Sequence, residues 1–397
     1  MSVFAWASLV GWLLAVAAAR LRSRPFVIFT AVKLGLSSLI AVALAPRFAW
    51  AWPAYCYLQA TVHLHSFSLV RPRLRSLAFR VLISIPAAFF GAGTLLALPW
   101  AVSRAFAYDL PWVGLPYAIA LIGVVQSLVM RHEEFDVAVG DADAGEGPKR
   151  HKRGALRVAR PLRIVQITDP HLGPFMSVER LAEIAQHAVD RQPDLVLLTG
   201  DFLTMESQSD PELLARALEP LAALPGRVFG CFGNHDHEAP EIVRAAFARI
   251  GGQLLIDDSA LVDTAAGRVQ VVGFDFCWRG RAAHLSRVCD AHPREAGALR
   301  LALLHDPGAF RHLPAGEADL VLSGHTHGGQ VGLVSLGLPW TMLRVFMNAP
   351  DHGFWARGWD RLYVHRGTGH YGFPLRVGVP AEDSLLRVHA SVLGSPA

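Results

Sequence analysis

The chain has 397 residues, which is more than one ordinary domain requires, so two units are expected. Its hydrophobic share of 52% and mean hydropathy of +0.32 are high for a soluble protein, and almost all of the excess lies before residue 131. This distribution argues against a uniformly soluble chain and predicts a membrane half followed by a soluble half.

The slight excess of positive charge, 37 Lys and Arg against 33 Asp and Glu, gathers at loop ends and in a cluster over residues 149–163. No aromatic residues are interleaved with that cluster, so nucleic acid is a disfavoured partner. Beside a membrane segment the cluster indicates a topology signal and contact with lipid headgroups. The four cysteines form no CxxC pair, which disfavours a disulfide framework and a zinc knuckle.

Five apolar stretches at the start of the chain are long enough to span a bilayer, which needs about 20 residues. They run approximately over residues 2–19, 26–46, 48–70, 81–102 and 110–130. The third stretch is the weakest, because it contains Pro53, Gln59, His63 and His65. Two interpretations of Lys33, His63 and His65 stay open: they form an intramembrane functional site, or their side chains face neighbouring helices or lie near an interface.

The loop charges predict the orientation of these stretches. Basic residues follow the first, third and fifth stretches, whereas the other two loops offer only Arg47 and Arg104. With five spans every strongly basic loop lies on one side, which the positive-inside rule makes cytoplasmic. We therefore predict a multi-pass protein of the cell (inner) membrane, with Met1 outside and the C-terminal domain in the cytoplasm. The side of that domain depends on whether the third stretch spans.

The second half of the chain predicts an α/β domain. Residues 133–160 are rich in Gly and charge and predict a linker between a transmembrane region over 1–132 and a catalytic domain over 161–397. Short β-branched runs then alternate with helix-like stretches. Strands are expected over 162–168, 194–199, 227–232, 268–274, 299–305 and 319–323. Helices are expected over 177–191, 211–223 and 239–250.

Five of these strand candidates end on residues that can bind metal ions. In chain order the motifs are Asp169-Pro-His171, Gly200-Asp201, Gly233-Asn234-His235-Asp236, His305-Asp306 and Gly324-His325-Thr326-His327. Each motif alone is weak, because a DxH pair or a GD after a strand is more often a turn. Ligands of open α/β sheets gather at the carboxyl ends of the strands, so the five motifs together predict one shared site.

The residue types fit hydrolysis of a phosphoester. Such an ester is anionic and repels hydroxide unless cations neutralise it, and two divalent ions about 3.5–4 Å apart also lower the pKa of the attacking water. Mixed carboxylate and imidazole ligands suit Mn, Fe or Zn, and the lack of cysteine ligands argues against structural zinc. We expect two divalent metal ions and attack by a metal-bound hydroxide.

The series DxH, GD, GNHD, H and GHTH resembles that of the calcineurin-like metallophosphoesterase family and is complete within residues 161–395. The stretches SGHTHGGQV (323–331) and YVHRGTG…PLR (363–376) are similar to those of bacterial members with N-terminal transmembrane segments. The resemblance implies a four-layer α/β/β/α sandwich after an all-α transmembrane region. GDFLT lacks the DRG that follows GD in Ser/Thr protein phosphatases, which disfavours that substrate class.

The resemblance also assigns roles by position. The first ion would be held by Asp169, His171 and His327, the second by Asn234, His305 and His325, with Asp201 as a bridge. His235 would contact the scissile phosphate and protonate the leaving oxygen. Two departures from the family are Asp306, where Asn is common, and the ending VGVPAED (377–383). His187 and Arg366 are expected at the surface.

Three functions are weighed. The favoured one is hydrolysis of a phosphate mono- or diester or a pyrophosphate at the membrane, with a lipid-linked substrate as a candidate because five spans exceed what anchoring requires. Family members that cleave the pyrophosphate of a nucleotide-linked acylated sugar make that compound a candidate. The alternatives are a phosphodiesterase of soluble nucleotides or nucleic acid, and a non-catalytic membrane sensor or scaffold. A degenerate domain should have lost ligands, whereas all seven positions are present.

Overall fold

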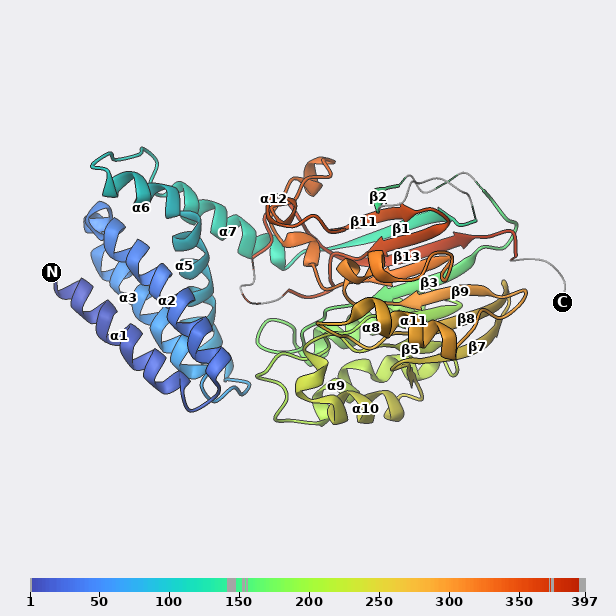
Figure 1. The fold of residues 1–397 in the computed structure, drawn as a ribbon. Coiled ribbons are helices and arrows are strands. Elements are labelled where there is room, and N and C mark those ends of the chain that lie inside the picture. Colours follow the sequence, from blue (N-terminus) through green and yellow to red (C-terminus); the bar gives the residue numbers. More distant parts are fainter. Residues whose placement is uncertain are drawn as a thin grey trace. The chain divides into compact units, whose positions relative to one another are not determined.

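The computed structural model describes residues 2–140, 148–151, 154, 156–370, 372 and 375–392. The chain divides into two compact units (Figure 1). The first comprises residues 1–128 with 372–377, and the second comprises residues 129–371 with 378–397.

The first unit is helical. Its elements are α1 (Val3–Ala19), α2 (Arg24–Leu44), η1 (Ala45–Ala51), α3 (Trp52–Ser68), α4 (Leu77–Phe79), η2 (Arg80–Ser84), α5 (Ile85–Leu96), α6 (Leu98–Ala105) and α7 (Leu115–Ser127). Two helical stretches, Arg24–Ser68 and Leu77–Leu96, are long and apolar enough to cross a membrane, whereas α1 and α7 are shorter. The region therefore holds two candidate spans, and the five predicted spans stay a prediction.

Local sequence explains where these helices begin and bend. The hydroxyls of Ser2 and Ser23 accept hydrogen bonds from the first turns of α1 and α2, so each serves as an N-cap. Between α2 and α3 the backbone leaves the helical region at Phe48, two residues after Pro46. Tyr55 of α3 donates a hydrogen bond to the Ala41 carbonyl across this bend, at 2.8 Å.

The second unit contains two mixed sheets. The first sheet has the order β1 (Met130–Ala138), β13 (Ala381–His389), β3 (Leu162–Ile167), β4 (Leu195–Leu198), β5 (Val228–Gly230) and β6 (Gln253–Leu254). The second sheet has the order β2 (Lys149–Arg150), β11 (Gly353–Arg357), β12 (Asp360–Val364), β10 (Leu320–Ser323), β9 (Leu299–Leu303), β8 (Gly267–Gly273) and β7 (Asp258–Thr264). Strands β3 to β6 run parallel, as do β8, β9, β10 and β12.

Buried apolar side chains cover both faces of the central strands. On one face of the first sheet they pack against α8 (Val178–Asp190), α9 (Glu212–Leu218) and α10 (Pro240–Arg249). On its other face they pack against the second sheet. The second sheet packs in turn against α11 (Arg281–Ala291) and η5 (Pro307–His312). Strands buried on both faces read as continuous apolar runs, which is why these strands could be predicted.

The six predicted strands and three predicted helices of this unit are present, with ends that differ by a few residues. Helix α8 begins as predicted, because the Ser177 hydroxyl accepts a hydrogen bond from the Arg180 N–H at 3.2 Å.

The predicted linker over 133–160 is wrong at its start and near its middle. Residues 130–138 form β1, which pairs in parallel with β13, and residues 149–150 form β2. Strand β1 lies at the edge of its sheet and keeps polar side chains along much of its length, so its sequence lacks a strong apolar signal. Residues 141–147, 152–153 and 155 of the predicted linker lie outside the described residues.

Candidate metal centre

The predicted ligands lie in loops that follow five parallel strands of the two sheets. Asp169 and His171 follow β3, Asp201 follows β4, Asn234 follows β5, His305 follows β9, and His325 and His327 follow β10. Because parallel strands end at the same edge, these loops meet there. The sheets therefore deliver side chains that are up to 158 positions apart in the sequence to one place.

A first group contains Asp169, His171 and His327, all buried, with one candidate ligand atom of each within 4.8 Å of the others. Nε2 of His171 lies 3.1 Å from Nε2 of His327. Nε2 of His327 lies 3.4 Å from Oδ1 of Asp169. These are the three residues that the resemblance assigned to the first ion.

A second group contains Asp201, His305 and His325, also within 4.8 Å of one another. Nε2 of His305 lies 3.3 Å from Oδ2 of Asp201 and 3.2 Å from Nδ1 of His325. The same Asp201 oxygen lies 3.7 Å from Nε2 of His171, which belongs to the first group. Asp201 thus stands between the two groups, as a bridging ligand requires.

The remaining predicted ligand, Asn234, presents a buried Oδ1 to which none of the described residues donates a hydrogen bond. A buried carbonyl oxygen without a donor is costly unless a cation or water satisfies it. His305 donates its Nδ1–H to the Thr199 carbonyl at 2.6 Å, so Nε2 is the ring nitrogen whose lone pair can bind a metal ion. Both observations fit a divalent ion in this position.

His235 lies beside the two groups. Its backbone N–H donates to Oδ1 of Asp201 at 2.9 Å, and its ring centroid lies 5.6 Å from that of His171. Its Nδ1 lies 3.2 Å from Oε1 of Glu238, and 18% of its side chain is exposed. The imidazole is therefore held next to the ligands while it keeps access to solvent and substrate.

The backbone of the centre is strained. Five of the candidate ligands have left-handed φ angles between 45° and 66°, which residues with a side chain rarely adopt: Asp169, His171, Asp201, His325 and His327. Such residues cost of order 1–3 kcal/mol each and persist where the surrounding fold over-determines them. They are concentrated here because the chain must turn sharply after each strand to aim a short side chain inward.

Electrostatics favour positive charge in this position. Burial alone would raise the pKa of the Asp169 and Asp201 carboxyls, but the neighbouring histidines hold the pKa of both well below the usual range. Burial alone would lower the pKa of His305, yet Asp201 and Asp169 raise it to about 10. The two buried carboxylates thus create a field that stabilises cations between them.

Asp236 supports the centre, and sequence reasoning did not single it out. Its carboxylate accepts backbone N–H bonds from Asp201 at 2.7 Å, Phe202 at 2.9 Å and Gly233 at 2.7 Å. Burial and repulsion from Asp201 raise its pKa to about 7. It ties the loop after β4 to the loop after β5, and the only signal was its place as the last residue of GNHD.

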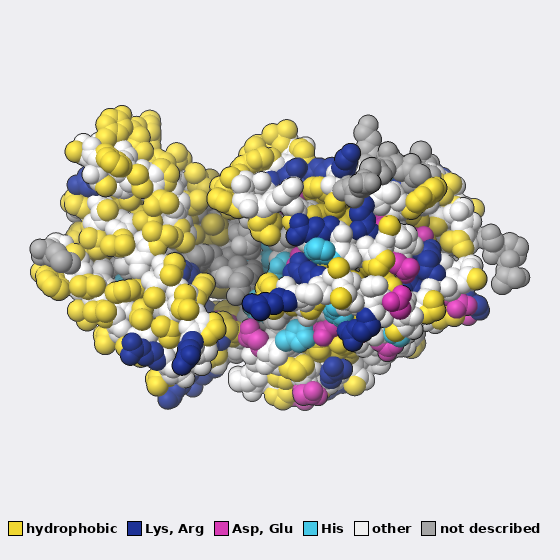
Figure 2. Space-filling view, in the orientation of Figure 1, with side chains coloured by type: hydrophobic (Ala, Val, Ile, Leu, Met, Phe, Trp, Pro, Cys, Tyr) yellow, Lys and Arg dark blue, Asp and Glu magenta, His cyan; other side chains and the backbone are white. Residues whose placement is uncertain are grey.

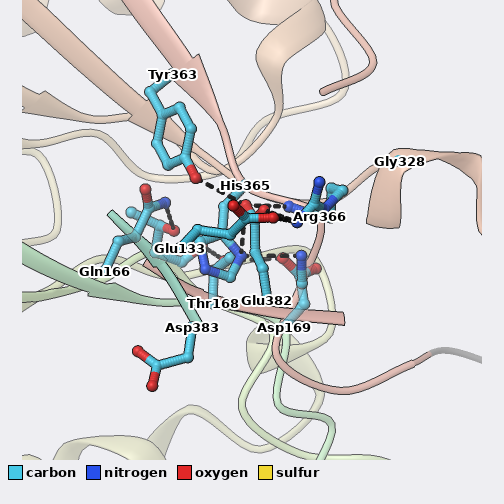
Figure 3. Close-up of polar contacts among 12 residues, drawn as sticks. Glu133, Gln166, Thr168, Asp169, Gly328, Tyr363, His365, Arg366, Glu382 and Asp383 are labelled. Carbon is cyan, nitrogen blue, oxygen red and sulfur yellow. Dashed lines mark hydrogen bonds and ion pairs between the residues drawn. The ribbon is translucent and has the colours of Figure 1, made fainter. Parts of the chain in front are cut away.

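A buried ionic network lies behind Asp169 (Figure 3). Arg366 places Nη2 2.6 Å from Oε2 of Glu382 and 2.7 Å from Oε1 of Glu133, and Tyr363 donates to Glu382 at 2.8 Å. The expectation that Arg366 is a surface residue is wrong, because only 6% of it is exposed. It pairs with Glu382, 16 positions away, and with Glu133, 233 positions away.

The network continues into the metal centre through the segment that follows Arg366. The Thr368 N–H donates to the Thr168 carbonyl at 2.8 Å, and the Gly369 N–H donates to the Asp169 carbonyl at 3.0 Å. Thr168 also donates its hydroxyl to Oδ2 of Asp169 at 2.7 Å. The network therefore supports the backbone and the carboxylate of one candidate ligand.

Paired buried carboxylates and imidazoles at strand ends are side chains that could hold divalent metal ions, as in metal-dependent hydrolases. Residues 162–329 match the family described as Calcineurin-like phosphoesterase. The chain therefore carries a calcineurin-like metallophosphoesterase domain.

Relatives with this domain come from bacteria and animals. Phosphodiesterase YaeI of Escherichia coli K12 is 28% identical over 236 residues, which are 58% of this chain and 83% of that protein. The uncharacterized metallophosphoesterase YkoQ of Bacillus subtilis 168 is 28% identical over 240 residues, which are 57% and 83%. A transmembrane protein with metallophosphoesterase domain of Danio rerio is 28% identical over 237 residues, which are 56% and 52%.

Gly324 permits the close approach of two loops, which gives a first prediction. A Cβ at this position would lie 2.1 Å from Oδ2 of Asp169 and 2.2 Å from Oγ1 of Thr168. We expect Gly324→Ala to displace the carboxylate, so that bound metal falls by at least half and stability falls by about 1–3 kcal/mol. Metal analysis and urea unfolding measure the two effects.

The matched control is Gly114→Ala, since a Cβ there would meet nothing within 4 Å. It should change neither quantity. Full metal content and unchanged stability in Gly324→Ala would show that this loop is not packed against the ligand.

Proposed function

We propose that the chain is a membrane-anchored two-metal phosphoesterase that hydrolyses a phosphodiester or pyrophosphate. The observation that carries this proposal is the position of Asp201, whose Oδ2 lies 3.3 Å from His305 and 3.7 Å from His171. One carboxylate between two imidazole groups is the arrangement that holds two cations at bridging distance.

Seven residues would hold the ions in this proposal. Asp169, His171 and His327 would bind one, and Asn234, His305 and His325 would bind the other, with Asp201 between them. The bound ions, Mn, Fe or Zn, would neutralise the phosphate and lower the pKa of the attacking water. His235 would donate a proton to the leaving oxygen. Burial lowers its pKa, but the hydrogen bond to Glu238 and the nearby carboxylates of Asp201 and Asp236 together outweigh burial and raise it.

The two alternatives are weaker. A non-catalytic sensor or scaffold has no need for two complete ligand groups or for a partly exposed histidine beside them. A phosphodiesterase of soluble nucleotides stays the runner-up, since the metal centre itself does not choose the leaving group. Features outside the ligand set must decide the substrate.

The segment over residues 331–349, here called the apolar flap, supports a lipid-linked substrate. It begins four residues after His327 and contains η7 (Val334–Leu336) and α12 (Leu343–Phe346). Its exposed apolar side chains are Leu333, Leu336, Leu338, Trp340, Met342, Val345, Phe346 and Met347. Figure 2 shows apolar side chains gathered over the part of the surface where α12 lies.

Such a patch is unusual on a domain that works in water alone. Its two most exposed members, Leu336 and Phe346, are 73% and 77% exposed. We propose that the apolar flap holds the acyl part of the substrate, so that the phosphate of a lipid-linked diester or pyrophosphate reaches the adjacent metal centre.

A flap variant tests this substrate class. The double substitution Leu336→Ser with Phe346→Ser should raise KM at least tenfold for a long-chain acylated phosphodiester in mixed micelles. It should leave kcat/KM for a small chromogenic phosphodiester within twofold, because the metal ligands are untouched. The matched control is Leu261→Ser on β7, which is 50% exposed on the same unit.

If the flap variant behaves like the Leu261 control with the acylated substrate, the proposal of a lipid-linked substrate is wrong. A phosphodiesterase of soluble nucleotides is then favoured. The metallophosphoesterase activity itself would be unaffected by that result.

The membrane arrangement is part of the proposal. Five spans, with Met1 outside and the catalytic domain in the cytoplasm, place all strongly basic loops on one side. For the catalytic domain we propose the four-layer α/β/β/α architecture that the family resemblance implies. This topology would let the cytoplasmic domain act on the inner leaflet.

Reporter fusions test the orientation. Green fluorescent protein joined after residue 128 should fluoresce, and alkaline phosphatase joined there should be inactive. Alkaline phosphatase joined after residue 107, between α6 and α7, should be active. The reverse pattern at both positions would place the catalytic domain outside the cytoplasm.

Substitutions of Asp201 and of His235 should affect metal content and turnover differently. Asp201→Asn removes the charge shared by the two ligand groups, so metal content and activity should fall together. His235→Ala should keep both metals and lose about 10²–10⁴-fold in turnover, the usual contribution of a general acid. An ester with a good leaving group needs no proton and should be affected much less.

Metal analysis and a series of leaving groups measure these effects. Two outcomes would contradict the assignment of His235: loss of metal as complete as in Asp201→Asn, or equal slowing of good and poor leaving groups.

A further inference from the structure

Among the described residues, a third cluster of metal-binding side chains lies apart from the candidate metal centre. It consists of His132 on β1, His187 on α8 and Asp383 on β13, each with one candidate ligand atom within 4.8 Å of the others. We call it the edge cluster. It shares no residue with the metallophosphoesterase ligands, and the ending VGVPAED supplies its carboxylate.

Strand register brings two of its members together. His132 and Asp383 are direct partners in the parallel pairing of β1 with β13. Glu382 and Asp383 are consecutive in β13 and so point to opposite faces of the sheet. Figure 3 shows the Asp383 carboxylate directed away from the ionic network that contains Glu382. His187 reaches the same carboxylate from α8.

The contacts converge on one oxygen. Oδ2 of Asp383 lies 3.1 Å from Nδ1 of His132 and 2.5 Å from Nδ1 of His187. The imidazole rings are inclined by 66°, with centroids 4.5 Å apart. Ligand bonds of about 2.0–2.2 Å in a tetrahedron separate ligand atoms by roughly 3.3 Å. The His132 contact is close to that spacing, and the 2.5 Å contact of His187 must widen by about 0.8 Å, through a small side-chain rotation, to admit an ion.

The solvent accessibility and the charges of the edge cluster also fit a site that binds a cation. The Asp383 side chain is 1% exposed, whereas those of His132 and His187 are 58% and 39% exposed, so an ion can enter from solvent. Arg191 lies 3.4 Å from the other oxygen, Oδ1, and would support a carboxylate that binds through Oδ2 alone. Such outer contacts orient the ligands of many metal sites.

We propose that the edge cluster is a binding site for a divalent transition-metal ion of the zinc type. Two imidazole nitrogens and one carboxylate oxygen suit Zn and its neighbours and do not suit Ca or Mg, which prefer oxygen ligands. Three protein ligands leave a fourth position for water. The ion would have ligands from the edge strand β1, from its neighbour β13 and from helix α8.

The ion therefore stabilises the attachment of β1. This strand follows the apolar region directly in the sequence and pairs only with β13 in its sheet. It also carries Glu133, whose carboxylate contacts Arg366 in the network behind Asp169. An ion bound at His132 would therefore also fix the position of Glu133, the next residue on β1, which contacts Arg366.

Metal counting on the full chain in detergent tests the site. The protein is first loaded with Mn²⁺, then equilibrated with Zn²⁺, and free ions are removed by gel filtration. The wild type should retain one metal equivalent more than the double variant His132→Ala with His187→Ala. The matched control is His292→Ala, a partly exposed histidine 3.9 Å from one carboxylate, which should retain the wild-type number.

Two further readouts separate metal binding from a simple ion pair between histidine and aspartate. Zn²⁺ should slow hydrogen exchange in residues 130–138 of the wild type and leave it unchanged in the double variant. Hydrolysis of a small chromogenic phosphodiester by the Mn²⁺-loaded double variant should stay within twofold of wild type, which also shows that it folds. Equal metal content in wild type and double variant, or equal Zn²⁺ protection of β1, overturns the proposal.

Discussion

The structure depends on two buried carboxylates that face one another across a set of imidazoles. Asp169 and Asp201 are almost fully buried, and isolated charges in such a place would cost several kcal/mol each. The fold offsets this cost by turning the chain sharply after each strand, so that histidines from the loops after β3, β9 and β10 surround the carboxylates. The strained ligand backbones and the close packing at Gly324 are consequences of that requirement.

A second set of charges keeps those loops in place. Asp236 collects three backbone N–H groups from the loops after β4 and β5, while Glu382 and Arg366 anchor the segment that meets the Asp169 carbonyl. Next to that segment, Thr168 donates its hydroxyl to the Asp169 carboxylate itself. These charged groups act by fixing the backbone. Burial and repulsion from Asp201 raise the pKa of Asp236, whereas Arg366 and His365 outweigh burial and lower the pKa of Glu382.

Much of the catalytic unit could be predicted from sequence, because its central strands are apolar runs that end on Asp, Asn or His. The parts that could not be predicted share a different property. Strand β1 lies at an edge and keeps polar side chains, so it has the composition of a linker. Arg366 looks like a surface residue because one of its acidic partners, Glu133, lies 233 positions away. His187 lies partly at the surface as expected, but its partner Asp383, which is 196 positions away, could not be predicted. No local pattern reports a pairing across such a distance.

Strand β13 is where these long-range pairings meet. It begins with the sequence Ala-Glu-Asp, and the alternation of a strand sends the two acids to opposite faces. Glu382 supports the network behind Asp169, and Asp383 contacts His132 and His187 on the other face. Because β1 carries both His132 and Glu133, it contributes to both faces at once. The edge strand that follows the apolar region is therefore tied to the backbone of the metal centre through its pairing with β13 and through the contact of Glu133 with Arg366.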